Sequence, residues 1–288
     1  MEDRQAQLDW ERRFARPAAA AAFASLAFGV GAQILSASSA NRQSGARNAL
    51  LNLTEHSDEA IAAAVLQALS VWFLVAVMYY LLRCVRARRP ETVPAAIAPL
   101  ILLAPALITV GGILTELDVI DIADRFTDSG PRTERRADDL LGDRNTVPIF
   151  VGFGGNIALG FCLVMINVHS MRAGLMTRFI GIIGIVVGAL YVVPFFAGPL
   201  ILQIFWLGAL IAILINRWPG GRGEAWETGE SGVWLSAAEL RRQELRDARE
   251  EQAAAAMDPR AGPEPAEAED LDARPHPVSK KRRRKRSR

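Results

Sequence analysis

The sequence predicts an all-α membrane protein, a polytopic bundle of six transmembrane helices followed by a largely disordered cytoplasmic tail. Three observations predict this class. Five long runs contain no charged residue, all 33 Lys and Arg and all 31 Asp and Glu residues lie outside these runs, and arginines gather on one side of the predicted spans. Because the helices of a soluble protein normally carry polar faces, a large soluble helical protein fits this distribution poorly.

The charge-free runs set the number of spans. Crossing the hydrocarbon core takes about 20 apolar residues, so each of the first four runs provides one span. The fifth run, Phe179 to Asn216, would be about 57 Å long as one helix, whereas the core is roughly 30 Å thick. Pro194, Gly198 and Pro199 break it into two. The predicted spans are 17–37, 60–82, 93–115, 147–168, 179–196 and 199–216.

The arginine distribution orients these spans. The loop after the second span, "RCVRARRPE", is rich in arginine, and Arg172 and Arg178 flank the loop after the fourth. By the positive-inside rule both loops are cytoplasmic. The loop 116–146 carries nine carboxylates against five arginines, and the alternation of six spans places it outside. Residues 1–16 and 217–288 are then cytoplasmic. Arginine and alanine usage is typical of a GC-rich bacterial genome, which indicates a bacterial plasma membrane.

The first span has an alternative interpretation. Residues 1–40 resemble a secretory signal with small residues near a cleavage point at Ala40. The apolar run is long for a signal peptide, and the segment before it is acidic as well as basic. We therefore expect the first span to be retained.

The sequence contains no recognisable catalytic or metal-binding motif. The predicted spans hold no Asp, Glu, Lys or Arg, although transporters that move ions usually keep such a residue in the membrane. Cys84 and Cys162 lack metal-ligand spacing, and no Walker loop, dinucleotide fingerprint, serine elbow or zinc-protease motif occurs. We expect no cofactor, no metal and no enzymatic activity.

The fourth span carries a stripe of small and polar residues. Gly152, Asn156 and Gly160 are four residues apart, and Asn167 follows eleven residues after Asn156, so all four share one helical face. Small residues let helices approach closely, and an asparagine can hydrogen-bond across the contact. We interpret the stripe as a helix-packing surface. The alternative is a polar lining for a small solute.

The third span contains Pro94, Pro99 and Pro105, followed by Gly111 and Gly112. Proline bends a membrane helix, and broken helices occur at transporter binding sites. The other half of the chain holds no second broken helix at a corresponding position. A kinked structural helix is the preferred interpretation.

The external loop predicts an amphipathic helix. Acidic residues recur every three or four positions at Asp118, Asp121, Asp124 and Asp128, with apolar residues between them. Such a cluster can bind a divalent cation, but no EF-hand spacing is present. A solvated acidic face is the preferred interpretation.

The tail predicts three parts. Trp218, Trp226 and Trp234 are eight residues apart and suit the membrane interface, although a partner-docking strip is an alternative. A helix is predicted at about 236–257, followed by an acidic, proline-rich linker expected to be disordered. The basic terminus 280–288 has eight cationic residues that we expect to contact anionic lipid or phosphate: Lys280, Lys281, Arg282, Arg283, Arg284, Lys285, Arg286 and Arg288.

Anionic lipids of the inner leaflet are the expected partner of this basic terminus, since they attract cations near the membrane surface. Nucleic acid is an alternative, because phosphate contacts need only cationic side chains, but no aromatic residue interrupts the run. Pairing with the acidic linker is compatible with lipid binding. A protein partner at the tail is also expected.

Three segments together resemble a family of uncharacterised multi-pass membrane proteins of high-GC Gram-positive bacteria. These segments are "ADDLLGDRN", "MRAGLMTRFIGIIGIVVGALYVVP" and "LQIFWLGALIAILINRWPGGRGEAWETGE", of which "AWETGE" is the most specific. The resemblance covers roughly 137–230 and leaves out the first two spans and the basic terminus. It implies a multi-pass membrane protein and assigns no activity or site.

Two functions follow as hypotheses. The first is a non-enzymatic membrane protein whose bundle anchors a cytoplasmic interaction tail. The second is a small-solute permease that uses the polar stripe of the fourth span.

Overall fold

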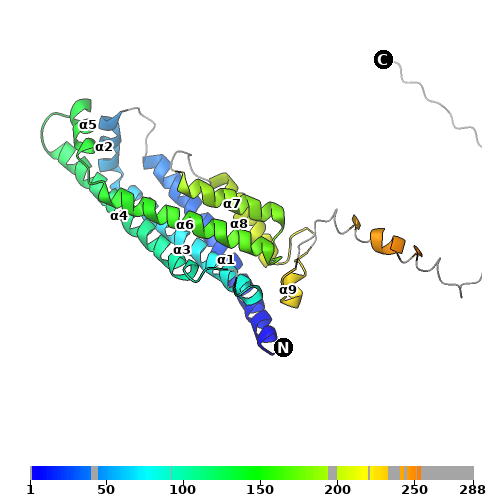
Figure 1. Cartoon of the computed structure of the whole chain (residues 1–288). Helices are drawn as coiled ribbons and strands as arrows, with labels where there is room; N and C mark the ends of the chain where they lie inside the picture. The colour runs from blue at the N-terminus through cyan, green and yellow to red at the C-terminus, as the bar shows by residue number, and fades with distance from the viewer. Residues whose placement is uncertain are drawn as a thin grey trace, which may run out of the picture. The chain divides into compact units, whose positions relative to one another are not determined.

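The computed structural model describes residues 2–39, 45–91, 93–193, 200–219, 221–232, 241–242, 245–250 and 252–253. Every regular element within these ranges is a helix (Figure 1). The chain divides into two units, Met1–Ala237 and Ala238–Arg288. The elements of the first unit are α1 Glu2–Ser39, α2 Ala46–Glu55, α3 Ser57–Arg88, α4 Ile97–Asp128, α5 Glu134–Gly142, α6 Val147–Arg172, α7 Arg178–Val192, α8 Leu200–Leu214 and α9 Ala225–Thr228.

Among the described residues, four helices are long and apolar enough to cross a membrane, namely α1, α3, α4 and α6. The remaining two predicted spans correspond to α7 and α8, which are apolar but have 15 residues each, or about 22 Å at the rise of an α-helix. α7 ends at Val192 and α8 begins at Leu200, on either side of the predicted break. The break itself, residues 194–199, lies outside the described residues.

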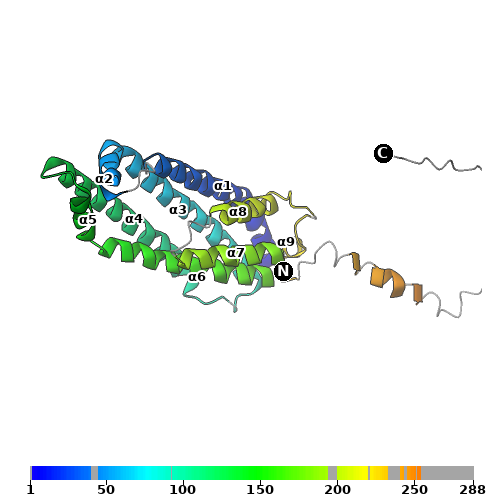
Figure 2. The same ribbon diagram turned by 90° about the horizontal axis from the view of Figure 1, so that it is seen from above.

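The long helices form one bundle with a shared apolar core. α1 packs along α3, α3 along α4, α4 along α6, and α6 along α7, while α8 packs against α1 and α7 (Figure 2). The core includes Met78, Ile101, Leu163 and Trp206, all fully buried. Many large apolar side chains on the outside of the helices are exposed, for example Phe150 and Ile201. An apolar exterior of this kind suits a hydrocarbon solvent.

Helix bounds and expected span bounds differ at two places. The first span was expected at 17–37, and α1 contains this range but begins at Glu2 and continues through Pro17; its first turns pack against α3 and contact Gly229 and Glu230. The third span was expected from residue 93, but α4 begins at Ile97 and continues to Asp128. Pro94 precedes the helix and Pro99 lies in its first turn, where a missing N–H costs nothing. Only Pro105 lies inside it.

The predicted external amphipathic helix is the last part of α4, and it belongs to a second small core. Ile122 and Phe126 of α4 are buried against Leu50 of α2 and Ala137 of α5, whereas Asp121 and Asp124 are exposed. We call this region, made of α2, the end of α4 and α5, the α2–α5 end. The opposite end, where α1 begins and α3, α6 and α8 finish, carries α9, and we call it the α9 end (Figure 1).

In the second unit, the described residues 241–242, 245–250 and 252–253 are helical and exposed. They fall inside the helix predicted at about 236–257. The proposed capping residues of that helix and the linker that follows it lie outside the described residues.

Candidate functional site

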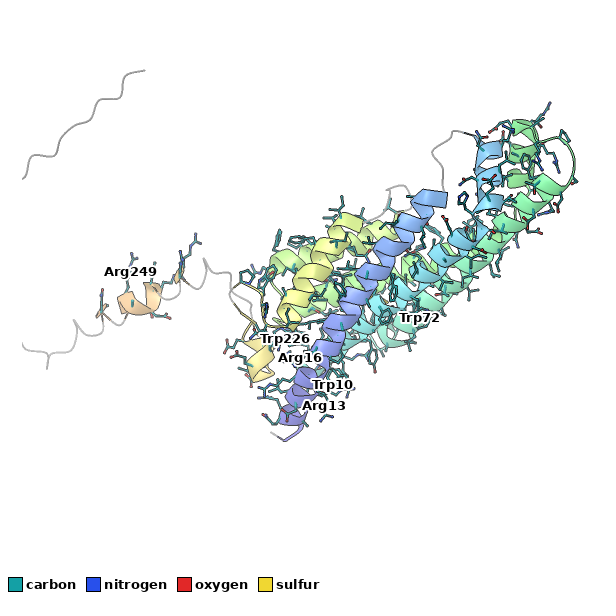
Figure 3. The ribbon with its side chains drawn as sticks, turned by 180° about the vertical axis from the view of Figure 1, so that it is seen from behind. Trp10, Arg13, Arg16, Trp72, Trp226 and Arg249 are labelled. Atoms are coloured by element: carbon teal, nitrogen blue, oxygen red, sulfur yellow. The ribbon has the colours of Figure 1, made fainter. Side chains whose placement is uncertain are left out.

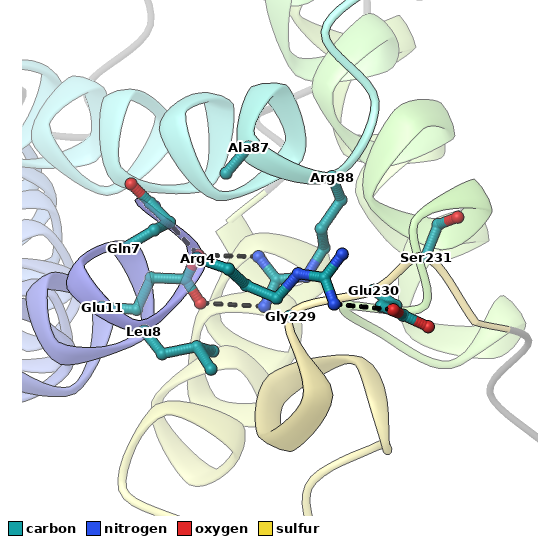
Figure 4. Close-up of a pocket in the computed structure, with 9 residues that line it drawn as sticks. All are labelled: Arg4, Gln7, Leu8, Glu11, Ala87, Arg88, Gly229, Glu230 and Ser231. Atoms are coloured by element: carbon teal, nitrogen blue, oxygen red, sulfur yellow. Dashed lines mark hydrogen bonds and ion pairs between the residues drawn. The ribbon is translucent and has the colours of Figure 1, made fainter. Parts of the chain in front are cut away.

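The α9 end contains a buried ion pair that joins three distant parts of the chain. Arg88, in the last turn of α3, donates two hydrogen bonds to the carboxylate of Glu11 on α1, with N–O distances of 2.7 and 2.8 Å (Figure 4). The side chains are 1% and 3% exposed. The carboxylate also accepts a bond from Gln7 one turn earlier on α1. The fork of the guanidinium matches the carboxylate, which is the strongest form of this pairing.

Arg88 also binds the segment that follows α8. Its Nε and one Nη donate to the backbone carbonyl of Ala225, at 3.1 and 2.6 Å, and another N–H donates to the carbonyl of Cys84. Together with the two bonds to Glu11, all five N–H groups of the guanidinium are used. A buried charge is tolerated only when it is paired and fully hydrogen-bonded, and Arg88 meets both conditions by holding α1 and α9 at once.

The short helix α9 corresponds to the "AWETGE" element. Within it, the backbone N–H of Trp226 donates to the carbonyl of Gly223, and that of Thr228 donates to the carbonyl of Glu224. The helix ends at Gly229, which adopts the left-handed conformation with φ 71°, as expected for a helix C-cap. Four residues cannot hold a helix by themselves. Contacts with the bundle therefore fix α9.

Trp226 makes most of those contacts. Its ring is 5% exposed, stacks on Tyr80 of α3 with centroids 6.4 Å apart, and lies under the guanidinium groups of Arg88 and Arg222 at 5.6 and 5.5 Å. The indole N–H donates to the carbonyl of Leu175, in the turn between α6 and α7, at 2.9 Å. A buried tryptophan needs such a partner for its N–H. One side chain thus joins α9 to α3 and to the α6–α7 turn.

The stacking continues to the first helix. Tyr80 lies against Trp10 of α1 at 5.6 Å, and the Tyr80 hydroxyl donates to the carbonyl of Glu11 at 3.1 Å. The guanidinium of Arg83 lies over the ring of Trp10, with its Cζ 4.1 Å from the ring centroid. Figure 3 shows Trp10 and Trp226 at the same end of the bundle. The result is a layer of aromatic and guanidinium groups across the α9 end.

A cleft of about 600 Å³ opens beside the ion pair, lined by α1, the end of α3 and residues 229–231 (Figure 4). Across it, Arg4 and Glu230 form an exposed pair at 2.7 Å. Exposed pairs contribute little, so the buried contacts account for the docking of this segment. The site is structural: it holds residues 225–230 on the bundle. We call the buried pair of Arg88 and Glu11, together with Trp226, the lock.

The predicted stripe on α6 contacts three partner helices, α4, α7 and α8. Gly152 lies against Gly111 of α4, where the backbones touch closely enough that a Cβ on Gly111 would collide with Gly152. Gly160 faces Gly188 of α7 in the same manner. Asn167 is fully buried, and its amide oxygen accepts from the indole N–H of Trp206 on α8 at 3.0 Å.

The two asparagines of the stripe have different surroundings. Asn156 is half-buried and donates to the carbonyl of Gly152 on its own helix. Asn167 donates in the same way to Leu163 and in addition accepts from α8. The stripe residues share a helical face in sequence, but in the structure Gly152, Gly160 and Asn167 each contact a different helix.

The predicted tail residues are only partly described. Trp226 was expected at the membrane interface, but its ring is covered by protein. Trp218 is half-buried and packs against the main core. Trp234 and the basic terminus Lys280 to Arg288 lie outside the described residues.

Sequence reasoning missed Glu11 and Arg88. Each stands in a short segment crowded with charges, "DWERRFARP" and "RCVRARRPE", where one buried charge looks like its solvated neighbours. They are 77 residues apart, and neither lies within a predicted span. The only local signal was the tryptophan of the "AWETGE" element, whose burial required a partner surface.

Comparison with known proteins identifies one family. Residues 18–235 match the model of a family described as a domain of unknown function, DUF4386. No curated protein and no solved structure matches the chain. The match begins at residue 18 and includes α3, so it corrects our expectation that the first two spans, 17–37 and 60–82, lie outside the family resemblance. Arg88 and Trp226 are within the matched range and Glu11 precedes it. Because the match spans most of the chain, the protein belongs to the DUF4386 family, an uncharacterised family.

Proposed function

We propose that the protein is a non-enzymatic, multi-pass protein of a bacterial plasma membrane whose bundle anchors a cytoplasmic interaction tail. In this proposal α7 and α8 are the fifth and sixth spans, so both termini lie in the cytoplasm. The supporting observation is the lock at the α9 end. The buried pair of Arg88 and Glu11 and the ring of Trp226 hold residues 225–230 against the bundle, which fixes the point where the tail leaves it.

The anchor proposal is tested in cells with a proximity-labelling enzyme fused to the C terminus of the full chain. We expect a defined set of labelled neighbours that changes when Trp226→Ala releases α9. Trp72→Ala is the matched control, because Trp72 is 42% exposed on the outside of α3. An identical set of neighbours for wild type and Trp226→Ala would contradict a role for the fixed exit point.

The orientation is tested by cysteine labelling from outside the cell. Ser129, beyond α4, and Ala87, near the end of α3, are both exposed. We expect a cysteine at position 129 to react with an impermeant reagent and a cysteine at position 87 to be protected. The reverse pattern would overturn the orientation.

The permease proposal has a separate basis at the opposite end. A hollow of about 590 Å³ lies between α1, α2, α3 and α4, with Gln33, Gln67, Thr109 and Glu116 among its lining residues. The stripe of the fourth span does not line this hollow, so the stripe is tested separately, at Asn156. Loss of solute flux in reconstituted vesicles for a folded Asn156→Leu variant would favour the permease. If the protein is an anchor, the wild-type chain should show no solute flux in this assay.

A further inference from the structure

Four arginines from two distant segments surround one hollow at the α9 end. Arg12 and Arg16 come from α1, and Arg217 and Arg222 come from the segment after α8. The hollow has a volume of about 460 Å³. Among the described residues that line it, none is acidic. Like charges repel at close range, so this convergence favours an anion between them.

The geometry after α8 places two of these arginines. Asn216 adopts the left-handed conformation with φ 58°, and the backbone N–H groups of Asn216 and Arg217 bond to Ile213 and Ala212. These two bonds form a Schellman motif, in which asparagine is an accepted C′ residue. The motif ends α8 sharply and turns the chain, so that Arg217 stands beside α1 rather than continuing along the helix axis.

Arg222 is held in place by the end of the same helix. Its Nε donates to the carbonyl of Ile213 at 2.9 Å, and an Nη donates to the carbonyl of Leu214. Its guanidinium also lies over Trp226. Its Nη1 makes none of these bonds and faces no carboxylate among the described residues. Arg222 is therefore a pre-oriented cation with donors to spare, which is the arrangement that favours recognition of phosphate oxygens.

The other arginines are exposed and weakly engaged. Arg12 lies 3.9 Å from the carboxylate of Asp9, with both side chains more than half exposed. Arg16 and Arg217 are exposed, and Figure 3 shows Arg16 on the first part of α1, at the end where Trp226 lies.

If α1 and α8 span the membrane as proposed, the hollow lies at the level of the lipid phosphates. Arg16 directly precedes the first charge-free run, and Arg217 directly follows the last one. The lining is completed by Asn216 and by the apolar residues Ala15, Leu214 and Ile215; of these three, Ile215 is 44% exposed and the other two are buried. A cationic pocket with an apolar wall at this level suits a lipid, whose phosphate meets the arginines while its chains follow the helices.

We propose that this hollow, defined by Arg12, Arg16, Arg217 and Arg222, binds the phosphodiester group of an anionic membrane lipid. The site is separate from the basic terminus at 280–288, and it does not rest on the anchor function. The arginines supply the charge for the phosphate, and the apolar wall selects a lipid over free phosphate.

The test is a titration of the purified full chain in detergent, followed by native mass spectrometry, with phosphatidylglycerol, phosphatidylcholine or inorganic phosphate as the probe. Wild type should hold phosphatidylglycerol in preference to phosphatidylcholine. Arg16→Gln with Arg217→Gln should weaken the tightest bound phosphatidylglycerol by about tenfold or more, from the attraction of two cations near a membrane surface. Lysine at both positions should recover part of this affinity.

The matched control is Arg135→Gln with Arg144→Gln, which removes two exposed arginines near the α2–α5 end and should leave the affinity unchanged. The basic terminus is present in every variant, so its own lipid binding cancels. The proposal is overturned if the Arg16 and Arg217 variant binds phosphatidylglycerol as wild type does, or if both double variants weaken it equally. Displacement of the lipid by an equal concentration of inorganic phosphate would overturn the assignment to a lipid.

Discussion

The two ends of the bundle are held together by different kinds of interaction. At the α9 end, a buried ion pair and a stack of aromatic rings join residues 10–11, 80–88 and 225–226. At the α2–α5 end, a small apolar core joins α2, α4 and α5. The hollow of about 590 Å³ lies beside this core. The lock depends on the positions of its hydrogen-bonding groups, so losing one partner leaves the other buried and unpaired. The small apolar core tolerates substitution better, but its packing contributes less stability.

Local contacts also differ between the ends. At the α2–α5 end, Arg136 of α5 donates to the carbonyls of Phe126 and Arg125 and so closes the loop after α4, and Arg47 reaches the carbonyl of Arg132. The Arg136 bonds tie neighbouring turns together, and the Arg47 bond joins segments 85 residues apart. The α9 end fixes a segment that lies 137 residues from Arg88 in sequence. Because the lock residues join the long helices of the bundle whereas few residues form the α2–α5 core, removing a lock residue should affect the whole bundle, and removing an α2–α5 residue should affect only that end.

The largest effect is expected from breaking the ion pair. Glu11→Ala leaves the Arg88 charge buried and unpaired, which typically costs about 3–5 kcal/mol of unfolding free energy. Thermal unfolding in detergent should show the loss. Glu11→Leu combined with Arg88→Met should recover much of it, because an apolar pair carries no charge to desolvate. Equal stability of Glu11→Ala and wild type would show that the pair is solvated.

Removing the tryptophan of the lock should have a somewhat smaller effect. Trp226→Ala deletes the ring between Tyr80 and two arginines and should cost about 3 kcal/mol. Trp226→Phe keeps a ring but leaves the carbonyl of Leu175 without its donor, at about 1–2 kcal/mol. Trp72→Ala, on the outside of α3, is the control in the same unfolding assay. A larger loss for Trp72→Ala than for Trp226→Ala would contradict the lock.

A glycine in the α6–α7 turn gives a third test. Gly174 has φ 73°, and a Cβ on it would collide with the carbonyl of Gly232 and contact Ala225. Gly174→Ala should cost about 1–3 kcal/mol from backbone strain and from displacement of the docked segment. Gly112→Ala is the control, since a Cβ there meets no atom within 4 Å. The two variants are compared by their unfolding temperatures, and equal temperatures would count against close docking at Gly174.

The smallest effect on the bundle is expected at the opposite end. Phe126→Ala removes the largest side chain of the α2–α5 core, but few residues pack there, and a partial opening leaves the long helices in place. Hydrogen exchange should accelerate in α2 and α5 and stay unchanged in α9. Faster exchange across the whole bundle would show that the two ends are not independent.

The sequence allowed the long helices and the amphipathic end of α4 to be predicted because their signals are local. Charge-free length marks α1, α3, α4 and α6, and the spacing of acidic residues marks the exposed face at the end of α4. The extension of α1 before Pro17 could not be predicted, since proline normally disfavours a helix interior and the contacts of the first turns come from α3 and residues 229–230, which are distant in sequence.

The lock could not be predicted because its contacts, too, join residues that are distant in sequence. Nothing near Glu11 distinguishes it from Asp9 or from the arginines beside it, and its partner Arg88 looks like one of several loop arginines that obey the positive-inside rule. Burial of this pair depends on where Trp226 and Ala225 dock, which only the folded chain determines. Charge counting treats all arginines in a loop alike, although one of them is structural.

The most direct test of the central claim is amide hydrogen exchange of α9 in the full chain, reconstituted in a lipid nanodisc. If the lock holds the start of the tail on the bundle, the amides of Trp226, Thr228 and Gly229 should exchange about a hundredfold or more slowly than unprotected peptide. They should lose this protection in Glu11→Ala, while α5 exchanges as before. Exchange of these amides at the unprotected rate in wild type would contradict the claim that the bundle fixes the exit of the tail.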